Sequence, residues 1–269
     1  MPPRPTRPTA RRLLQPVALF SIVALSLSAC GDSVAPTSAR GRQPAEKLAT
    51  LSVTALGKVP YVELSGSISA ATSSSSLTVT DVVEGDGSTM GTVDVVGNPT
   101  GTKDARFTGS VRFVVSDQTT WVDGSKAFWT SLLSTSGAGA RQVAALLPKL
   151  ANHWIELVAA TTTTFNEQTG GLIDPRGFAQ EFLHDSAGKF SNKGDLYLNG
   201  QHVVELTTKV GAAVDLAPSG SALPFEIRTQ PPAEVTTDLH YSYPTSETIA
   251  PPKHFEYLET ILAPYTSKP

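Results

Sequence analysis

The segment Asp195–Leu206, DLYLNGQHVVEL, carries the clearest local fold signal in the chain. Apolar residues alternate with polar ones on both sides of Asn199-Gly200, so each side has one apolar and one polar face. An Asn-Gly pair between two such runs suits a type I′ turn, because both central residues of that turn take positive φ angles. The segment therefore predicts an antiparallel β-hairpin with a tight turn at Asn199-Gly200.

The same period of two recurs on both sides of this hairpin. Three upstream runs alternate in this way: Val62, Leu64 and Ile68; Leu77, Val79 and Val83; and Phe107, Val111, Phe113 and Val115. Downstream, a second hairpin is expected to join Ala213–Ala217 to Phe225–Thr229 around Ser219-Gly220, and Thr236–Tyr243 is expected to be the last strand. Strands of this kind are typical of an antiparallel sheet with one covered face.

Between the two strand groups the apolar spacing changes to that of helices. Helices are expected at Ser125–Leu133 and at Arg141–Leu150. A third is expected from Asp174-Pro175, an N-cap followed by Pro at the first helical position, to a stop at Gly188. A fourth follows Pro44, with an apolar face formed by Leu48, Leu51, Ala55 and Leu56. Helices inserted in a meander pack on one face of its sheet, so the expected fold class is α+β.

The N-terminus has the features of a secretory leader. Four arginines precede a 13-residue apolar stretch, Val17–Ala29, and no acidic residue lies among them. A helix of that length rises about 20 Å, which is short of the roughly 30 Å hydrocarbon core of a bilayer. We therefore expect a signal peptide at residues 1–29, and no permanent membrane span.

The leader ends at Leu27-Ser28-Ala29-Cys30, and Cys30 is the single cysteine of the chain. This sequence resembles the bacterial lipobox, in which the thiol receives a diacylglyceryl group, with acyl chains such as palmitate, and the chain is cut before the cysteine. Two acyl chains hold a protein stably on a membrane. Two alternatives stay open: a chance cysteine after an uncleaved leader, and export by the twin-arginine route through Arg11-Arg12, which Gln15 disfavours.

Cleavage before Cys30 would remove the four leader arginines and move the formal net charge from −3 to −7. Nucleic acid is a poor partner for so acidic a surface. We expect residues 30–43 to form a lipid-anchored flexible tether, residues 44–252 one domain, and residues 253–269 a C-terminal tail. The expected location is the extracytoplasmic face of the cell membrane, where the lipid on Cys30 anchors the protein.

The order of these elements resembles a known family of carriers. The segments that carry the resemblance are QTTWVDG (118–124), SKAFWTSLL (125–133), ANHWIELVA (151–159), DLYLNGQHVVEL (195–206) and ALPFEIRT (222–229). Together they resemble actinobacterial lipoproteins of the LppX/LprG kind, within the wider LolA/LolB-like fold of lipoprotein and lipid carriers. The resemblance implies a curved antiparallel half-barrel with helices packed on its concave face and an apolar cavity between them.

On that resemblance, the protein would bind a lipid, glycolipid or other amphiphile and carry or present it as a monomer, without catalysis. The residues expected to line the cavity come from the inward face of the strands and from the helices. They are Val62, Leu64, Ile68, Val79, Phe113, Val115, Phe128, Trp129, Leu132, Phe178 and Phe182. These side chains could equally fill an ordinary core. The alternative function is then an envelope binding or scaffolding lipoprotein without a cavity.

A hydrolase is the third functional alternative, and the sequence motifs that would support it are incomplete. The stretch Gly87–Gly91 has Thr where a G-x-S-x-G elbow needs Ser. Ser186–Lys189 fits S-x-x-K but falls at a helix end, and no K-T-G follows. Glu181, His184 and Asp185 share a helix, yet a solvated helix end explains them equally well. We expect no catalytic residue, no cofactor and no metal, since the five histidines lack the i, i+4 spacing of helical zinc motifs.

Overall fold

The computed structural model describes the residues from 38 to 266 with short gaps: 38–70, 75–85, 87–97, 108–135, 137–169, 171–198, 200–229, 233 and 235–266. All of them belong to one compact unit, Asp32–Pro269, and the other unit is Met1–Gly31. The expected leader and Cys30 therefore lie outside the described residues, as do Phe107 and Asn199.

The described residues form one 12-stranded sheet in the order β12-β6-β5-β4-β3-β2-β1-β11-β10-β9-β8-β7. All neighbouring strands are antiparallel except β12, which lies parallel to β6. The strand bounds are β1 Tyr61–Ala70, β2 Ser76–Gly85, β3 Ser88–Val96, β4 Gly109–Ser116, β5 Thr119–Gly124, β6 Trp154–Glu156, β7 Phe190–Leu198, β8 Gln201–Thr208, β9 Ala212–Leu216, β10 Pro224–Thr229, β11 Val235–Ser242 and β12 Glu256–Tyr257.

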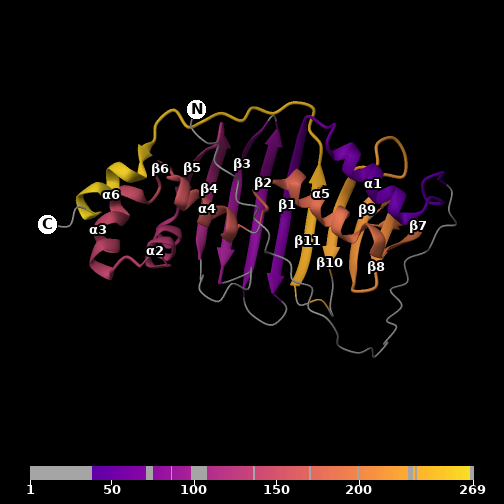
Figure 1. Cartoon of the computed structure of the whole chain (residues 1–269), viewed down its shortest axis with the longest axis horizontal. Helices are drawn as coiled ribbons and strands as arrows, with labels where there is room; N and C mark the ends of the chain where they lie inside the picture. The colour runs from indigo at the N-terminus through magenta and orange to yellow at the C-terminus, as the bar shows by residue number, and fades with distance from the viewer. Residues whose placement is uncertain are drawn as a thin grey trace, which may run out of the picture. The chain divides into compact units, whose positions relative to one another are not determined.

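Two meanders make up this sheet, and β1 joins them (Figure 1). Strands β1 to β6 follow one another in space, and so do β7 to β11. The last strand of the second meander then pairs with the first strand of the first, with Leu64 opposite Tyr241. The sheet does not close, because β7 and β12 stay at its two edges. The expected α+β class with a large antiparallel sheet is confirmed.

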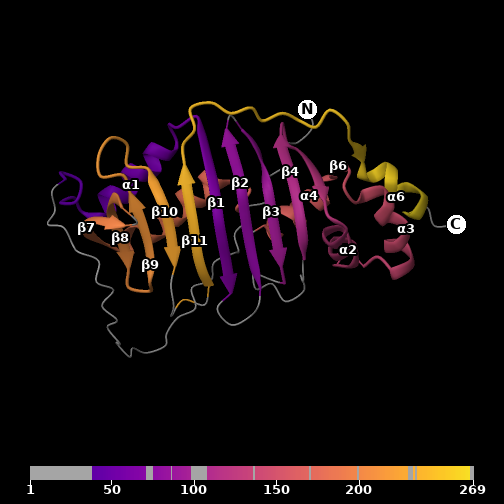
Figure 2. The ribbon, with the colours of Figure 1, turned by 180° about the vertical axis from the view of Figure 1, so that it is seen from behind.

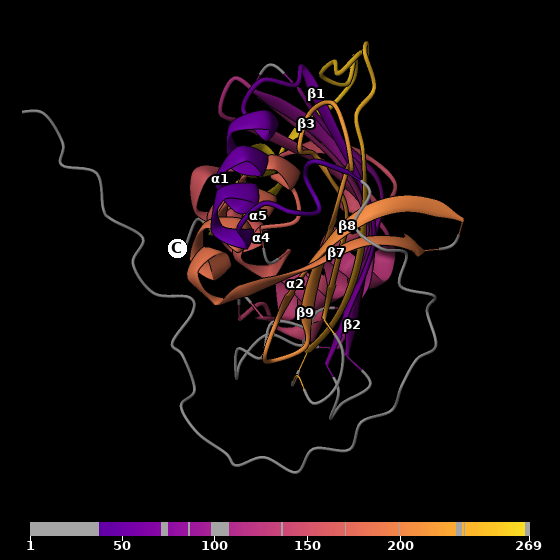
Figure 3. The ribbon, with the colours of Figure 1, turned by 90° about the vertical axis from the view of Figure 1, so that its right-hand side faces the viewer.

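Three helices lie on one side of the sheet: α1, α4 and α5 stand in front of the strands in Figure 1, behind them in Figure 2 and to one side of them in Figure 3. Helix α5 packs on α1 and on β1 and β2. The helix bounds are α1 Ala45–Leu56, α2 Lys126–Thr135, α3 Ala140–Leu150, α4 Ala159–Gln168, α5 Pro175–Ser186 and α6 Leu258–Thr266. No helix within the described residues has both the length and the apolar content to span a bilayer.

The local signals were reliable where capping or turn chemistry supported them. Asp174 caps α5 through its Oδ1, which accepts a hydrogen bond from the Gly177 amide at 2.8 Å. Ser125 caps α2 in the same way, by accepting from the Phe128 amide at 3.2 Å. Gly200, between β7 and β8, has a φ of 80°, as the predicted tight turn requires.

Helix α4 and strand β3 were not predicted from the sequence. Helix α4 includes Thr161–Thr164, four β-branched residues with low helix propensity, so its sequence gives little helical signal. Strand β3 carries Gly91, whose Cβ would lie 2.6 Å from a methyl carbon of Val82. The glycine is required there because β2 and β3 approach closely, but in the sequence it interrupts the apolar alternation.

Three expectations differ from the structure. Leu51 was placed on the buried face of α1, but it is 38% exposed, and the buried residues are Leu48, Ala49, Ser52 and Leu56. The tail at 253–269 adds β12 and α6 to the sheet edge at β6, and its Leu258 and Ile261 are buried. The tether at 30–43 was expected to be solvated throughout, yet residues 38–43 form hydrogen-bonded turns against β7.

Candidate functional site

The residues expected to line a cavity come together in one hydrophobic cluster, but they differ in exposure. Val62, Leu64, Val79, Phe113, Phe128, Trp129 and Leu132 are buried within it. Ile68, Val115, Phe178 and Phe182 are half-buried and pack against it. The structure therefore brings all eleven side chains to one apolar interior, and four of them keep some contact with solvent.

One group of aromatic rings fills the interior beside β4. The rings of Phe128 and Trp129 on α2 meet edge to face with their centroids 5.1 Å apart. Phe165 of α4 contacts Phe113 at 5.9 Å and Phe128 at 6.4 Å, again edge to face. Such contacts are those of a packed core. Phe165 is the ring that sequence analysis missed, because α4 itself was not predicted.

A second aromatic group lies along α5 and is less enclosed. The rings of Phe178 and Phe182 stack with their centroids 6.5 Å apart and their planes 16° from parallel. Phe182 also contacts Phe190 at the start of β7, at 6.4 Å. Both α5 rings stay half-buried although they pack on the hydrophobic cluster. The apolar interior therefore keeps some contact with solvent along this side of α5.

The opposite side of α5 is fixed by polar contacts. Arg176 pairs with Glu84 on β2 at 3.0 Å, and its backbone amide donates to the same carboxylate at 2.8 Å. Gln180 donates to the Val53 carbonyl of α1 at 3.4 Å. Burial raises the pKa of Glu84, although the Arg176 amide and guanidinium oppose that shift. Since residues two apart on a helix lie about 200° around its axis, Phe178 and Phe182 face away from these contacts.

A shallow depression lies elsewhere, on the outer side of α1. It has a volume of about 360 Å³, and it is lined by Pro44, Glu46, Lys47, Thr50 and Leu51. These lining residues are mostly exposed, and none belongs to the set expected to contact a ligand. The depression is therefore a separate surface feature.

The residues considered for hydrolase chemistry lie at a solvated helix end. His184 contacts Asp185 at 3.3 Å, but its side chain is 83% exposed. Glu181 on the same helix is also exposed, and so is Lys189 of the S-x-x-K stretch. A general base in open water gains no help from burial or from a fixed neighbour. The arrangement gives these residues no catalytic geometry.

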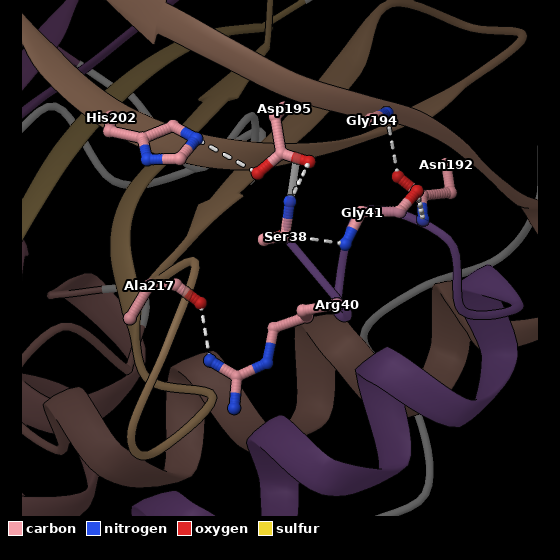
Figure 4. A network of polar contacts seen from close by, with 8 residues as sticks. All are labelled: Ser38, Arg40, Gly41, Asn192, Gly194, Asp195, His202 and Ala217. Carbon is pink, nitrogen blue, oxygen red and sulfur yellow. Dashed lines mark hydrogen bonds and ion pairs between the residues drawn. The ribbon is translucent and has the colours of Figure 1, made fainter. Parts of the chain in front are cut away.

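A polar network that sequence analysis missed surrounds Asp195 on β7 (Figure 4). The Ser38 amide donates to Oδ2 of Asp195 at 3.2 Å, and His202 Nε2 lies 2.8 Å from Oδ1. Burial raises the pKa of Asp195, but the hydrogen bonds from Ser38 and His202 lower it by more, so the net shift is downward. Ser38 and His202 both meet the carboxylate, whereas in a catalytic triad the histidine lies between the other two residues. We interpret the network as a structural contact.

The same network holds the segment Ser38–Gln43 against the domain. Asn192 donates its Nδ2 to the carbonyl oxygens of Gly41 at 3.1 Å and Gln43 at 2.8 Å. Arg40 donates to the carbonyl oxygen of Ala217, and also to that of Gly220 at 2.7 Å. A Cβ on Gly41 would lie 2.0 Å from the Asp195 carboxylate, so only glycine fits there. The segment is docked on β7 and on the loop between β9 and β10.

The polar face of strands β8 to β10 carries an ionic cluster around Arg228. Its guanidinium lies 2.6 Å from Asp215, 3.0 Å from Glu205 and 2.8 Å from Glu226. Burial raises the pKa of Asp215 to about 6, since the attraction of Arg228 is partly offset by the two neighbouring glutamates. One cation among three carboxylates leaves this cluster negatively charged.

A group that could hold a metal ion adjoins this cluster. Glu226 on β10 lies opposite His240 on β11, and Asp238 shares a strand face with His240 because it is two residues away. The donor atoms of the three side chains lie within 4.8 Å of one another. The three residues come from two paired strands, so the i, i+4 spacing of helical zinc motifs does not reveal them. Asp238 and His240 are more than half exposed.

The comparisons with known proteins come from structure alone. No protein-family model matches the chain, and no curated protein matches it. LprF from Mycobacterium bovis is similar at 13% identity over 77% of this chain and 96% of its own, with a TM-score of 0.41. The lipoprotein LppX from Mycobacterium tuberculosis is similar at 14% identity over 77% of this chain and 98% of its own, also with a TM-score of 0.41.

A third similar structure is the MucA/MucB complex from Pseudomonas aeruginosa, at 14% identity over 76% of this chain and 59% of its own, with a TM-score of 0.29. LprF and LppX are mycobacterial lipoproteins of the LppX/LprG family. LppX is also one of the lipoproteins after which the resembled family is named. At these identities and TM-scores, nothing about ligands or partners follows from the similarity.

Proposed function

We propose that this protein is a membrane-anchored extracytoplasmic lipoprotein that binds a lipid or another amphiphile between its sheet and its helices and carries or presents it without catalysis. The observation that carries the proposal is the pair of stacked rings of Phe178 and Phe182. They pack on the hydrophobic cluster and remain half-buried, on the side of α5 that faces away from its polar contacts. An acyl chain would enter the apolar interior along this side.

The energetic requirement on such a carrier is a dry surface of matching size. Moving an acyl chain out of a bilayer costs about 0.8 kcal/mol per methylene, so the protein must return a similar amount. The sheet would form a half-barrel with α1, α4 and α5 over its concave face. The eleven predicted lining residues would then supply the apolar contacts, with Phe178 and Phe182 at the entrance and the fully buried residues deeper inside.

The anchor in this proposal is a diacylglyceryl group on Cys30. It would place the mature chain on the extracytoplasmic face of the cell membrane, next to a source of lipid. The basic start, the short apolar run and the small residues before Cys30 support it.

A second function is favoured by a different observation. Phe113, Phe128, Trp129 and Phe165 are almost fully buried and contact one another, which is how a closed core packs. A closed core would make the protein an envelope binding or scaffolding lipoprotein without a lipid cavity.

Lipid analysis of the protein purified from membranes distinguishes the two functions. Native mass spectrometry of the wild-type chain should reveal a bound lipid in addition to the acyl groups on Cys30. Phe178→Asn and Phe182→Asn should each reduce the bound fraction several-fold, while the half-buried positions let the domain stay folded. Leu51→Asn is the matched control, because Leu51 is also partly exposed but lies on the outer side of α1.

A wild-type chain without bound lipid would reject the carrier function and favour the scaffold. An equal loss of lipid in the Leu51→Asn chain would show that the effect is not specific to the α5 entrance.

A further inference from the structure

The docked segment places the first described residue against one edge of the sheet. Ser38 is held by Asp195 on β7, and Asp195 is two residues from Tyr197 at the end of the same strand. The ring of Tyr197 stacks on His202. The Nε2 of His202 contacts Asp195 (Figure 4). Ser38, the first residue that the structure describes, therefore lies beside the hairpin of β7 and β8.

The length of chain before Ser38 limits how far this hairpin can be from an anchor at Cys30. Eight residue steps separate Cys30 from Ser38, and a fully extended chain spans at most about 3.6 Å per residue, or roughly 29 Å in all. The hairpin lies at the β7 edge of the sheet, whereas β12 is the opposite edge. Neighbouring strands are about 4.8 Å apart, so the two edges are separated by roughly 50 Å along the sheet.

The exposed residues of the hairpin suit a lipid headgroup layer. The side chain of Tyr197 is 55% exposed, and Tyr257 on β12 is 54% exposed, so both edges carry such a ring and only the short tether favours the β7 edge. Lys193 on the same strand is exposed as well. Tyrosine is enriched where the headgroups of a bilayer meet water, and lysine is attracted to anionic headgroups.

We infer that the hairpin of β7 and β8 is the membrane-facing end of the domain, held there by the docking of Ser38–Gln43. The inference rests on the proposed lipid anchor at Cys30, and the occupant of this surface is the bilayer that holds the acyl chains. With Ser38 docked, at most the eight residue steps from Cys30 to Ser38 separate the anchor from the domain, so the β7 edge stays close to the membrane and the β12 edge can lie farther away.

Fluorescence quenching on vesicles tests this orientation. Cys30 is the one cysteine in the chain and is acylated under the proposal, so a second cysteine provides a unique thiol. Gln201→Cys places a label at the hairpin, and Glu256→Cys places it on β12; both positions are exposed. The full-length lipidated chains are reconstituted in phosphatidylcholine and phosphatidylglycerol vesicles that contain a lipid with a nitroxide headgroup. The label at 201 should be quenched several-fold more than the label at 256.

A second pair of chains tests the role of docking. Arg40→Ala, Asn192→Ala and Asp195→Ala together remove the side-chain contacts to the β9–β10 loop, to Gly41 and Gln43, and to Ser38. In this background the quenching at 201 should fall toward that at 256, while flotation with the vesicles is unchanged. The difference in quenching between positions 201 and 256 in the docked chain tests the orientation independently of this variant.

The outcomes separate this inference from the proposed function. Equal quenching at the two positions, or stronger quenching at 256, with full flotation would overturn the orientation alone. Unchanged quenching at 201 after release would overturn the role of docking. A wild-type chain that does not float would refute the lipid anchor and, with it, the inference.

Discussion

The backbone amide of Ser38 donates a hydrogen bond to Oδ2 of Asp195, 157 residues further along the chain, at a distance of 3.2 Å. This contact joins the start of the domain to the β7 edge of the sheet, and Asp195 is buried beneath it. A buried carboxylate is stable only if it is well hydrogen-bonded. The stability of the domain should therefore depend on the charge of this group.

The net pKa shift of Asp195 is downward, below its ordinary value of 3.8. A lowered native pKa means that the stabilisation is present above about pH 4 and is lost as the pH falls below it. Asp195→Asn should reduce the free energy of unfolding at pH 7 by about 1–2 kcal/mol. The variant should also lose less of its free energy of unfolding between pH 4 and pH 3 than the wild type does, as measured by urea denaturation. Asp185→Asn is the control, because Asp185 is more than half exposed; an equal effect there would contradict the role of Asp195.

Asp215 should have the opposite pH dependence, because burial raises its pKa to about 6. The folded state favours the protonated form of Asp215. The resulting contribution of Asp215 to the free energy of unfolding is therefore full below about pH 4 and is lost as the pH rises through 6. Comparing pH 5 with pH 7, Asp215→Asn should remove a pH-dependent stabilisation of about 1 kcal/mol, since only the part of the shift between pH 5 and 6 falls in this window. The Asp195→Asn chain is the control, and its denaturation should still show the difference in stability between pH 5 and pH 7. A variant whose stability keeps the wild-type pH dependence would rule out this role for Asp215.

The turn between β7 and β8 gives a prediction on stability alone. Gly200 has a φ of 80°, and a side chain in this left-handed region costs about 1–2 kcal/mol. Gly200→Ala should lower the free energy of unfolding by that amount. Gly188→Ala should be close to neutral, because Gly188 has open space around it and no positive φ. Chemical denaturation of both chains checks this, and similar losses at the two positions would argue against a turn-specific effect.

The lipid anchor predicts a defined mature N-terminus. Mass spectrometry of membrane-extracted protein should find a chain that begins at Cys30 and carries a diacylglyceryl group. Cys30→Ala should release the protein from the membrane or block its processing, because the thiol is the acceptor of the lipid. Soluble mature protein cut at another position would end the lipoprotein proposal.

The hairpin at Asp195–Leu206 was predictable because alternation and Asn-Gly chemistry act within a dozen residues. The cap at Asp174 was local in the same sense, and the helix at Ser125–Leu133 and the α+β class also followed from sequence. The eleven residues of the candidate site were identified as inward-facing from the period of each element. Their exposure was not predictable, because it depends on which helix covers which strand.

Contacts between distant segments were decided by the tertiary structure alone. Helix α4 forms in spite of its threonines, because Phe165 is buried against Phe113 and Phe128. The Ser38–Asp195 contact, the carboxylates around Arg228 and the pairing of Glu226 with His240 all join different elements. The sequence by itself determined most of the strands and the helix capped by Asp174, because each of these depends on near neighbours, and the lipobox-like leader stays a prediction. Only the fold set the docking of the N-terminal segment and the uneven burial of the aromatic rings, because these depend on the strand order that places β7 at one edge and β1 beside β11.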